Sequence, residues 1–144
     1  MIENKYMMRE NEIRVLAIAV IRSGKQILVS PGRDKVKGED FYRLPGGGID
    51  FGELSRDGLA REIEEEFGAK LVNVKFLKVV ENVFTFNEMR GHEICFVYQA
   101  DFADQALYKK IELEILDTPG GKALWVDMDK LGLVYPQGAL DHLE

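Results

Sequence analysis

The feature that most constrains this chain is a glycine-flanked, glutamate-rich segment, which reads GGIDFGELSRDGLAREIEEEFG from Gly47 to Gly68. Ser55 is a good N-cap residue, because its hydroxyl accepts an unpaired backbone N–H of the first helical turn. Gly68 is a good helix end, because the residue that follows a helix often adopts a positive φ. The segment therefore predicts a helix between Ser55 and Gly68.

At about 100° per residue, this helix has two different faces. The carboxylates of Glu62, Glu65 and Glu66 lie mostly opposite the apolar stripe and repel one another. Hard divalent cations such as Mg²⁺ take oxygen ligands and remove that repulsion. Gly58 costs about 1 kcal/mol relative to Ala inside a helix, so we expect it to leave room for a bulky group. The apolar stripe consists of Leu59, Ile63 and Phe67, with Ala60 at its edge.

A bare glutamate-rich helix face is usually solvated surface, but the neighbouring residues favour a metal site. Gly47, five residues, Glu53, seven residues and then Arg61-Glu62-Ile63-x-Glu65-Glu66-x-Gly68 resembles the Nudix box. That signature belongs to a family that hydrolyses nucleoside diphosphates linked to another moiety. Every fixed polar and glycine position matches, and the lead-in Leu44-Pro45-Gly46-Gly47-Gly48 also looks like this family. The one departure is Ala69, at a packing position where the family usually has a larger aliphatic residue.

The resemblance implies attack of water at a phosphorus of a pyrophosphate linkage, with Mg²⁺ as the cofactor and Mn²⁺ as a substitute. It implies that Glu65 and Glu66 are the principal metal ligands. Glu62 is expected to be a further ligand or the base that activates water, and Gly47 offers its carbonyl oxygen. Bound Mg²⁺ neutralises the diphosphate and lowers the pKa of a bound water.

Other residues of the box and its surroundings have supporting roles. Glu53 is expected to be a ligand or a water-orienting group. Arg61 is expected to hold a box carboxylate through a bidentate pair, and to reach at most one carboxylate of the stripe. The family often recruits an acid from outside the box, and the candidates here are Glu93 and Asp117. His92 is expected to be structural rather than a base.

Length and composition limit the class of protein. A chain of 144 residues fits one domain, so residues 1–144 are expected to form a single Nudix hydrolase domain. A net charge of −6 disfavours long nucleic acids and leaves a small nucleotide-type substrate as the expected partner. The single cysteine, Cys95, predicts a core residue rather than a reactive thiol. No signal peptide or membrane-spanning run is evident, so we expect a cytoplasmic protein without membrane contact.

The remainder of the chain predicts strands and short helices. Ile13 to Ile21 is rich in β-branched residues with little alternation, which predicts a strand buried on both faces and a hairpin with the strand that follows. Met1 to Asn11 predicts either a loose terminus or an added strand at a homodimer contact. Further predicted strands are Gln26 to Ser30, Leu71 to Phe86, Glu93 to Phe102, Ile111 to Leu116 and Ala123 to Val126. Predicted loops are Pro31 to Asp40 and Asn87 to Gly91, and predicted short helices are Asp127 to Leu131 and Pro136 to Leu143. The family resemblance implies an α/β/α sandwich, with a mixed sheet between helices and the box as loop–helix–loop.

In this family, specificity depends on residues outside the box. Tyr42, Arg43, Phe84 and Phe86 are candidate substrate-binding residues, whose aromatic rings either stack on a base or cover the core. Arg33 either carries ordinary surface charge or contacts phosphates. The candidate substrates are nucleotide sugars including ADP-ribose, nucleoside triphosphates and dinucleoside polyphosphates, and no residue selects among them. A hydrolase is favoured over a non-catalytic Nudix-fold nucleotide-binding or sensor module, because no box glutamate is missing.

Overall fold

In the computed structural model, the described residues 10–143 form a nine-stranded mixed sheet with one α-helix, α1 (Ser55–Phe67). The strands are β1 (Ile13–Ser23), β2 (Gln26–Asp34), β3 (Glu39–Arg43), β4 (Gly46–Gly48), β5 (Leu71–Phe86), β6 (Met89–Phe102), β7 (Glu112–Glu114), β8 (Lys122–Asp127) and β9 (Val134–Tyr135). Two short 3₁₀ helices are η1 (Gln105–Lys109) and η2 (Met128–Lys130). The predicted N-terminal segment lies outside the described residues except for residues 10 and 11, so the dimer contact stays a prediction.

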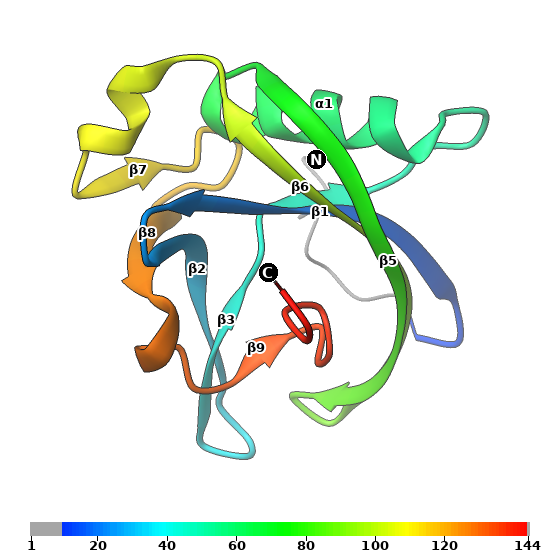
Figure 1. Cartoon of the computed structure of the whole chain (residues 1–144). Helices are drawn as coiled ribbons and strands as arrows, with labels where there is room; N and C mark the ends of the chain where they lie inside the picture. Colours follow the sequence, from blue (N-terminus) through cyan, green and yellow to red (C-terminus); the bar gives the residue numbers. More distant parts are fainter. Residues whose placement is uncertain (1–9, 144) are drawn as a thin grey trace.

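The sheet runs in the order β5-β6-β1-β2-β3-β9, with β4 paired to β1, β8 to β2 and β7 to β8. β1 is parallel to β6 and β3 is parallel to β9, whereas β2 is antiparallel to β1, β3 and β8. The sheet is strongly curved, and α1 lies across it at the top of the view (Figure 1). The predicted α/β class with a mixed sheet is confirmed, and one α-helix, α1, packs on this sheet in residues 10–143.

β1 separates two apolar clusters, which confirms the strand predicted to be buried on both faces. Ala17 and Ala19 pack in a cluster that includes Leu59 of α1. Ile18 and Val20 pack in a second cluster on the opposite face of β1. Because adjacent residues of a strand point to opposite faces, α1 covers one face of β1 only.

The predicted polar loop over residues 31–40 was wrong, because β2 and β3 extend through it as a hairpin. Only the turn 35–38 separates the two strands. The buried Asp34 carboxylate accepts hydrogen bonds from the backbone N–H of Lys37 at 3.0 Å and of Asn87 at 3.1 Å. The pKa of Asp34 is lowered by these bonds, chiefly the one from Lys37. The polar residues here therefore join the tip of the β2–β3 hairpin to the tip of the β5–β6 hairpin, at the bottom of Figure 1.

The sequence predicted the C-terminal end of α1 correctly but not the N-cap residue. Gly68 has φ 61° and its N–H donates to the carbonyl of Glu64 at 2.8 Å, which confirms the predicted stop. The predicted N-cap was wrong, because Leu54 occupies that position without a side-chain cap. The Ser55 hydroxyl lies 2.5 Å from the hydroxyl of Tyr98 on β6, so it bonds the sheet instead of the helix terminus.

The C-terminal region contains less helix than predicted. Residues 136–142 form turns, so the helix predicted from Pro136 to Leu143 was wrong. The backbone N–H of Asp141 donates to the carbonyl of Gly138 at 3.2 Å, which is a turn bond, and the ammonium group of Lys78 on β5 donates to the same carbonyl at 3.1 Å. The predicted helix at Asp127 to Leu131 is the 3₁₀ helix η2.

Candidate functional site

The carboxylate face of α1 lies against the glycines of β4. Glu62 and Glu66 are buried, whereas Glu65 is exposed. The backbone N–H of Gly46 donates to Oε1 of Glu66 at 3.2 Å. A Cβ atom on Gly47 would lie 2.5 Å from Oε2 of Glu62, so glycine at this position lets the carboxylate approach the strand. The glycine-rich turn thus lets a carboxylate of α1 pack directly against β4.

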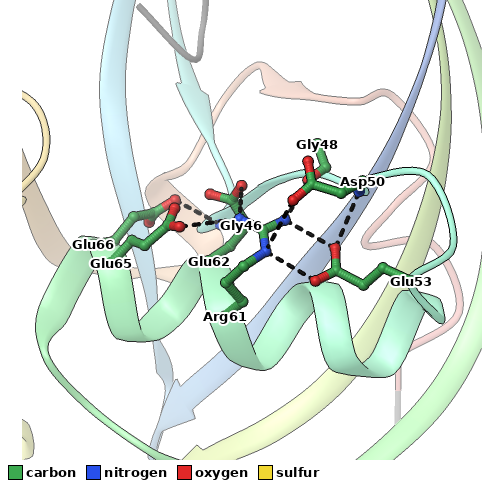
Figure 2. A network of polar contacts seen from close by, with 8 residues as sticks. All are labelled: Gly46, Gly48, Asp50, Glu53, Arg61, Glu62, Glu65 and Glu66. Carbon is green, nitrogen blue, oxygen red and sulfur yellow. Dashed lines mark hydrogen bonds and ion pairs between the residues drawn. The ribbon is translucent and has the colours of Figure 1, made fainter. Parts of the chain in front are cut away.

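Arg61 is the centre of a polar network that joins the loop before α1 to the helix (Figure 2). Nε and Nη2 donate to the two oxygens of Glu53, each at 2.9 Å, which is the predicted bidentate pair. Nη2 also donates to the carbonyl of Gly48 at 2.9 Å. Nη1 donates to Glu62 at 3.0 Å and to Glu65 at 3.2 Å. The expectation that Arg61 reaches at most one carboxylate of the stripe was therefore wrong, because Nη1 lies between two of them.

This network keeps Glu53 ionised. The hydrogen bonds from Arg61 are the main cause, and with the backbone N–H of Asp50 they lower the pKa of Glu53 to about 2. The pKa of Arg61 is raised, chiefly by its hydrogen bond with Glu53. A Cβ atom on Gly58 would lie 2.8 Å from Oε1 of Glu53. The room predicted at Gly58 is therefore occupied by a carboxylate of the same chain.

A candidate metal centre lies at the C-terminal half of α1. Within residues 10–143, Glu62, Glu65 and Asp117 each offer a carboxylate oxygen, and these oxygens all lie within 4.8 Å of one another. Asp117 comes from the loop after β7, which is held close by a 2.7 Å hydrogen bond from the N–H of Leu116 to the carbonyl of Glu66. An all-oxygen donor set fits a hard cation such as Mg²⁺. The structure thus brings one of the two predicted outside acids to the box.

The other predicted outside acid, Glu93, lies elsewhere. It lines a cavity on the face of β1 opposite α1, together with Leu16 and Ile18. His92, the neighbour of Glu93, lies 3.1 Å from the exposed side chain of Glu81. Neither Glu93 nor His92 belongs to the carboxylate cluster.

Aromatic rings from several strands form the walls of this cavity, and three of the predicted substrate-binding residues line it. These are Arg43, Phe84 and Phe86. The rings of Phe41 and Phe86 lie 5.9 Å apart between centroids, and the guanidinium of Arg43 lies 5.1 Å above the Phe41 ring. Tyr135 of β9 adds a further ring, 5.1 Å from Phe41.

Two other predicted substrate-binding residues are placed outside the cavity lining. Tyr42 packs against the second apolar cluster. Arg33 is exposed and bonds Asp40 at 2.6 Å, as surface charge does. The sequence indicated that the segment from Glu81 to Phe86 borders the substrate without singling out Asn82, and Asn82 lines the cavity as well.

The sequence profile of the NUDIX domain matches residues 11–143. The chain therefore belongs to the Nudix family. A segment of 58 residues is 41% identical to an RNA pyrophosphohydrolase of Ruthia magnifica subsp. Calyptogena magnifica. This alignment covers 40% of the chain and 31% of the relative, so it spans about a third of that protein's length.

Solved structures show the same fold. A MutT Nudix hydrolase from Burkholderia pseudomallei is 28% identical, with 83% of this chain and 86% of that chain covered and a TM-score of 0.62. A mutator MutT protein from Bacillus halodurans is 21% identical, covers 83% and 74% of the two chains and has a TM-score of 0.56, which supports the fold alone. In the described range 10–143, no helix has the length and apolar character needed to cross a membrane.

Proposed function

We propose that this chain is a Mg²⁺-dependent hydrolase that cleaves a pyrophosphate linkage of a small nucleotide-type substrate, with Mn²⁺ as a substitute cation. The observation that carries the proposal is the cluster of carboxylate oxygens from Glu62, Glu65 and Asp117. The guanidinium of Arg61 holds the Glu62 carboxylate at this cluster. Mg²⁺ bound there neutralises phosphate charge and makes water a stronger nucleophile.

The residues of the chain have separate tasks in this proposal. Glu62, Glu65 and Asp117 would hold the cation through their carboxylate oxygens. Arg61 keeps the carboxylates of Glu62 and Glu65 in position. Glu53 is a positioning residue, because both of its oxygens bond Arg61. Glu66 holds β4 against the helix, because its Oε1 accepts a hydrogen bond from the N–H of Gly46. The carbonyl of the next residue, Gly47, stays a candidate ligand.

Three further observations support a small phosphorylated substrate. The similar proteins include one named RNA pyrophosphohydrolase and one named MutT Nudix hydrolase, and both names denote hydrolases. The net charge of −6 disfavours non-specific binding of long nucleic acids. The cavity lined by Phe84 and Arg43 offers rings and a cation to a nucleotide. We propose that this cavity binds the nucleoside part of the substrate.

The test is product release from a nucleotide panel in Mg²⁺, with Glu65→Gln compared with Glu64→Gln. Glu64 is an exposed neighbour on the same helix and serves as the matched control. Loss of a key catalytic group costs about 100-fold or more, so Glu65→Gln should lose nearly all turnover while Glu64→Gln keeps it. Retention of more than about a tenth of the activity by Glu65→Gln would contradict the assignment. Nucleotide binding without turnover in the unmodified chain would indicate a sensor module instead.

A further inference from the structure

A row of polar side chains crosses the wall of the cavity formed by β5, β6 and β1. Asn82 of β5 is paired with Glu93 of β6, and Glu93 is paired with Arg14 of β1. Residues directly opposite one another on adjacent strands have Cβ atoms about 5 Å apart and share a face. All three side chains line the cavity. The row two residues further along is apolar and consists of Val80, Cys95 and Leu16.

The carboxamide of Asn82 is the first sign that this row binds a ligand. Asn82 is 8% exposed and lines the cavity, yet its side chain makes no hydrogen bond within residues 10–143. Burial of a polar group without a partner is unfavourable. The Asn82 amide lines the cavity beside Glu93 without a hydrogen-bond partner in the described residues, so it is available to a polar group that enters the cavity.

Glu93 adds a carboxylate beside that amide. Its side chain is 16% exposed and lies 3.7 Å from Nη1 of Arg14. Burial raises the pKa of Glu93, and the positive charges of Arg14 and Arg43 oppose this shift. The Glu93 carboxyl group thus places hydrogen-bond acceptors next to an amide that can donate.

The aromatic walls are shaped by glycines on the paired strands. Phe84 faces Gly91 across β5 and β6, and a Cβ atom on Gly91 would lie 2.4 Å from the ring. Phe41 faces Gly32 across β3 and β2, and a Cβ atom on Gly32 would lie 2.5 Å from the ring. Each ring therefore lies over the neighbouring strand, and β5 and β3 stand on opposite sides of the curved sheet (Figure 1). Flat rings beside hydrogen-bonding groups suit a planar heterocycle.

We propose that Asn82 and Glu93 select guanine as the base of the substrate, which rests on the proposed function. Guanine presents two adjacent N–H donors, at N1 and the 2-amino group, beside the O6 acceptor. The Glu93 carboxylate accepts from the two donors, and the Asn82 amide donates to O6. Adenine, cytosine and uracil each place at least one acceptor where guanine has a donor, so they lose a hydrogen bond and face the carboxylate charge. Arg14 is a positioning residue, because it holds Glu93.

The test is equilibrium binding of GMP, IMP and AMP to the full chain without metal, measured by calorimetry. GMP should bind about tenfold or more tightly than AMP, and IMP should fall between them because it lacks the 2-amino donor. Glu93→Gln and the near-isosteric Asn82→Leu should each weaken GMP by about tenfold and leave AMP nearly unchanged. Glu81→Gln is the matched control, because Glu81 lies next to Asn82 on β5 with an exposed side chain, and it should leave both affinities unchanged.

Equal affinity for GMP and AMP, or equal weakening of both by Glu93→Gln, would overturn the guanine assignment even if other nucleotides are hydrolysed. Selective GMP binding without any hydrolysis would support the assignment and overturn the hydrolase. Melting curves identify any variant that fails to fold, and the comparison of GMP with IMP on the unmodified chain then decides the question.

Discussion

Replacement of Arg61 by alanine tests whether one guanidinium holds the box together. The change removes hydrogen bonds to both oxygens of Glu53, to Glu62, to Glu65 and to the carbonyl of Gly48. The three carboxylates then lose a shared cation and repel one another more strongly. We expect a less stable protein with weaker binding of Mg²⁺.

The size of the effect follows from the exposure of each partner. The side chains of Glu53 and Glu62 are 18% and 6% exposed, so loss of their cation is costly. The Glu65 side chain is 44% exposed, and its pair with Arg61 adds little. Removal of one partner from a buried ion pair costs about 3–5 kcal/mol, and the partial exposure of Arg61 argues for the lower end, about 3 kcal/mol. For a domain of this size, that lowers Tm by roughly 6–12 °C.

The assay is thermal and urea unfolding in the presence of a chelator, with Arg56→Ala as the matched control. Arg56 lies on the same helix, and its Nη2 donates to the carbonyl of Val74 at 3.0 Å. A single bond of this kind is worth about 1 kcal/mol or less at an exposed site. If Arg61→Ala and Arg56→Ala have the same free energy of unfolding, Arg61 does not hold the box and the reasoning is refuted.

Three other outcomes are expected. Mg²⁺ at a hundred times its Kd should stabilise the folded chain by about 2.7 kcal/mol and so raise its Tm. Na⁺ at matched ionic strength should not raise the Tm, and Mg²⁺ should not raise the Tm of a Glu62/Glu65/Asp117→Gln/Gln/Asn variant. Equal Tm shifts with Mg²⁺ in the two proteins would show that the cluster does not bind the metal. Gly58→Ala should destabilise the unmodified chain, because the new methyl group meets Glu53. In a Glu53→Ala background the same change should stabilise the chain by about 1 kcal/mol, because alanine has the higher helix propensity. A change in unfolding free energy of the same sign in both backgrounds would show that contact with Glu53 does not decide the effect. The pKa of Glu53 is lowered from 4.5 to about 2. The stabilisation of the fold by ionised Glu53 is therefore fully present above about pH 4.5 and is lost as the pH falls toward 2. Glu53→Gln should make the unfolding free energy less dependent on pH across that range.

Local patterns predicted the elements whose shape depends on nearby residues. Leu59, Ile63 and Phe67 share a helical stripe in any packing, and they are buried against the sheet. Gly68 ended the helix as expected, because glycine has no Cβ and adopts a positive φ without strain. The bounds predicted for β5, Leu71 to Phe86, match the structure as well. Here local preference and tertiary packing favoured the same answer.

Contacts between distant segments decided the rest. Ser55 has the chemistry of an N-cap, but Tyr98 is 43 positions away and takes its hydroxyl. Glu93 and Asp117 looked equivalent as outside acids, and only the loop packed on the end of α1 brings Asp117 to the box.

The sequence by itself determined the family, the glutamate-rich helix and its glycine stop, because these depend on residue type and short spacing. Only the tertiary structure decided which side chains meet. Asn82, Glu93 and Arg14 form one row because the registers of β5, β6 and β1 place them side by side. Strand register depends on turns and packing across the whole sheet, so no local pattern contains it.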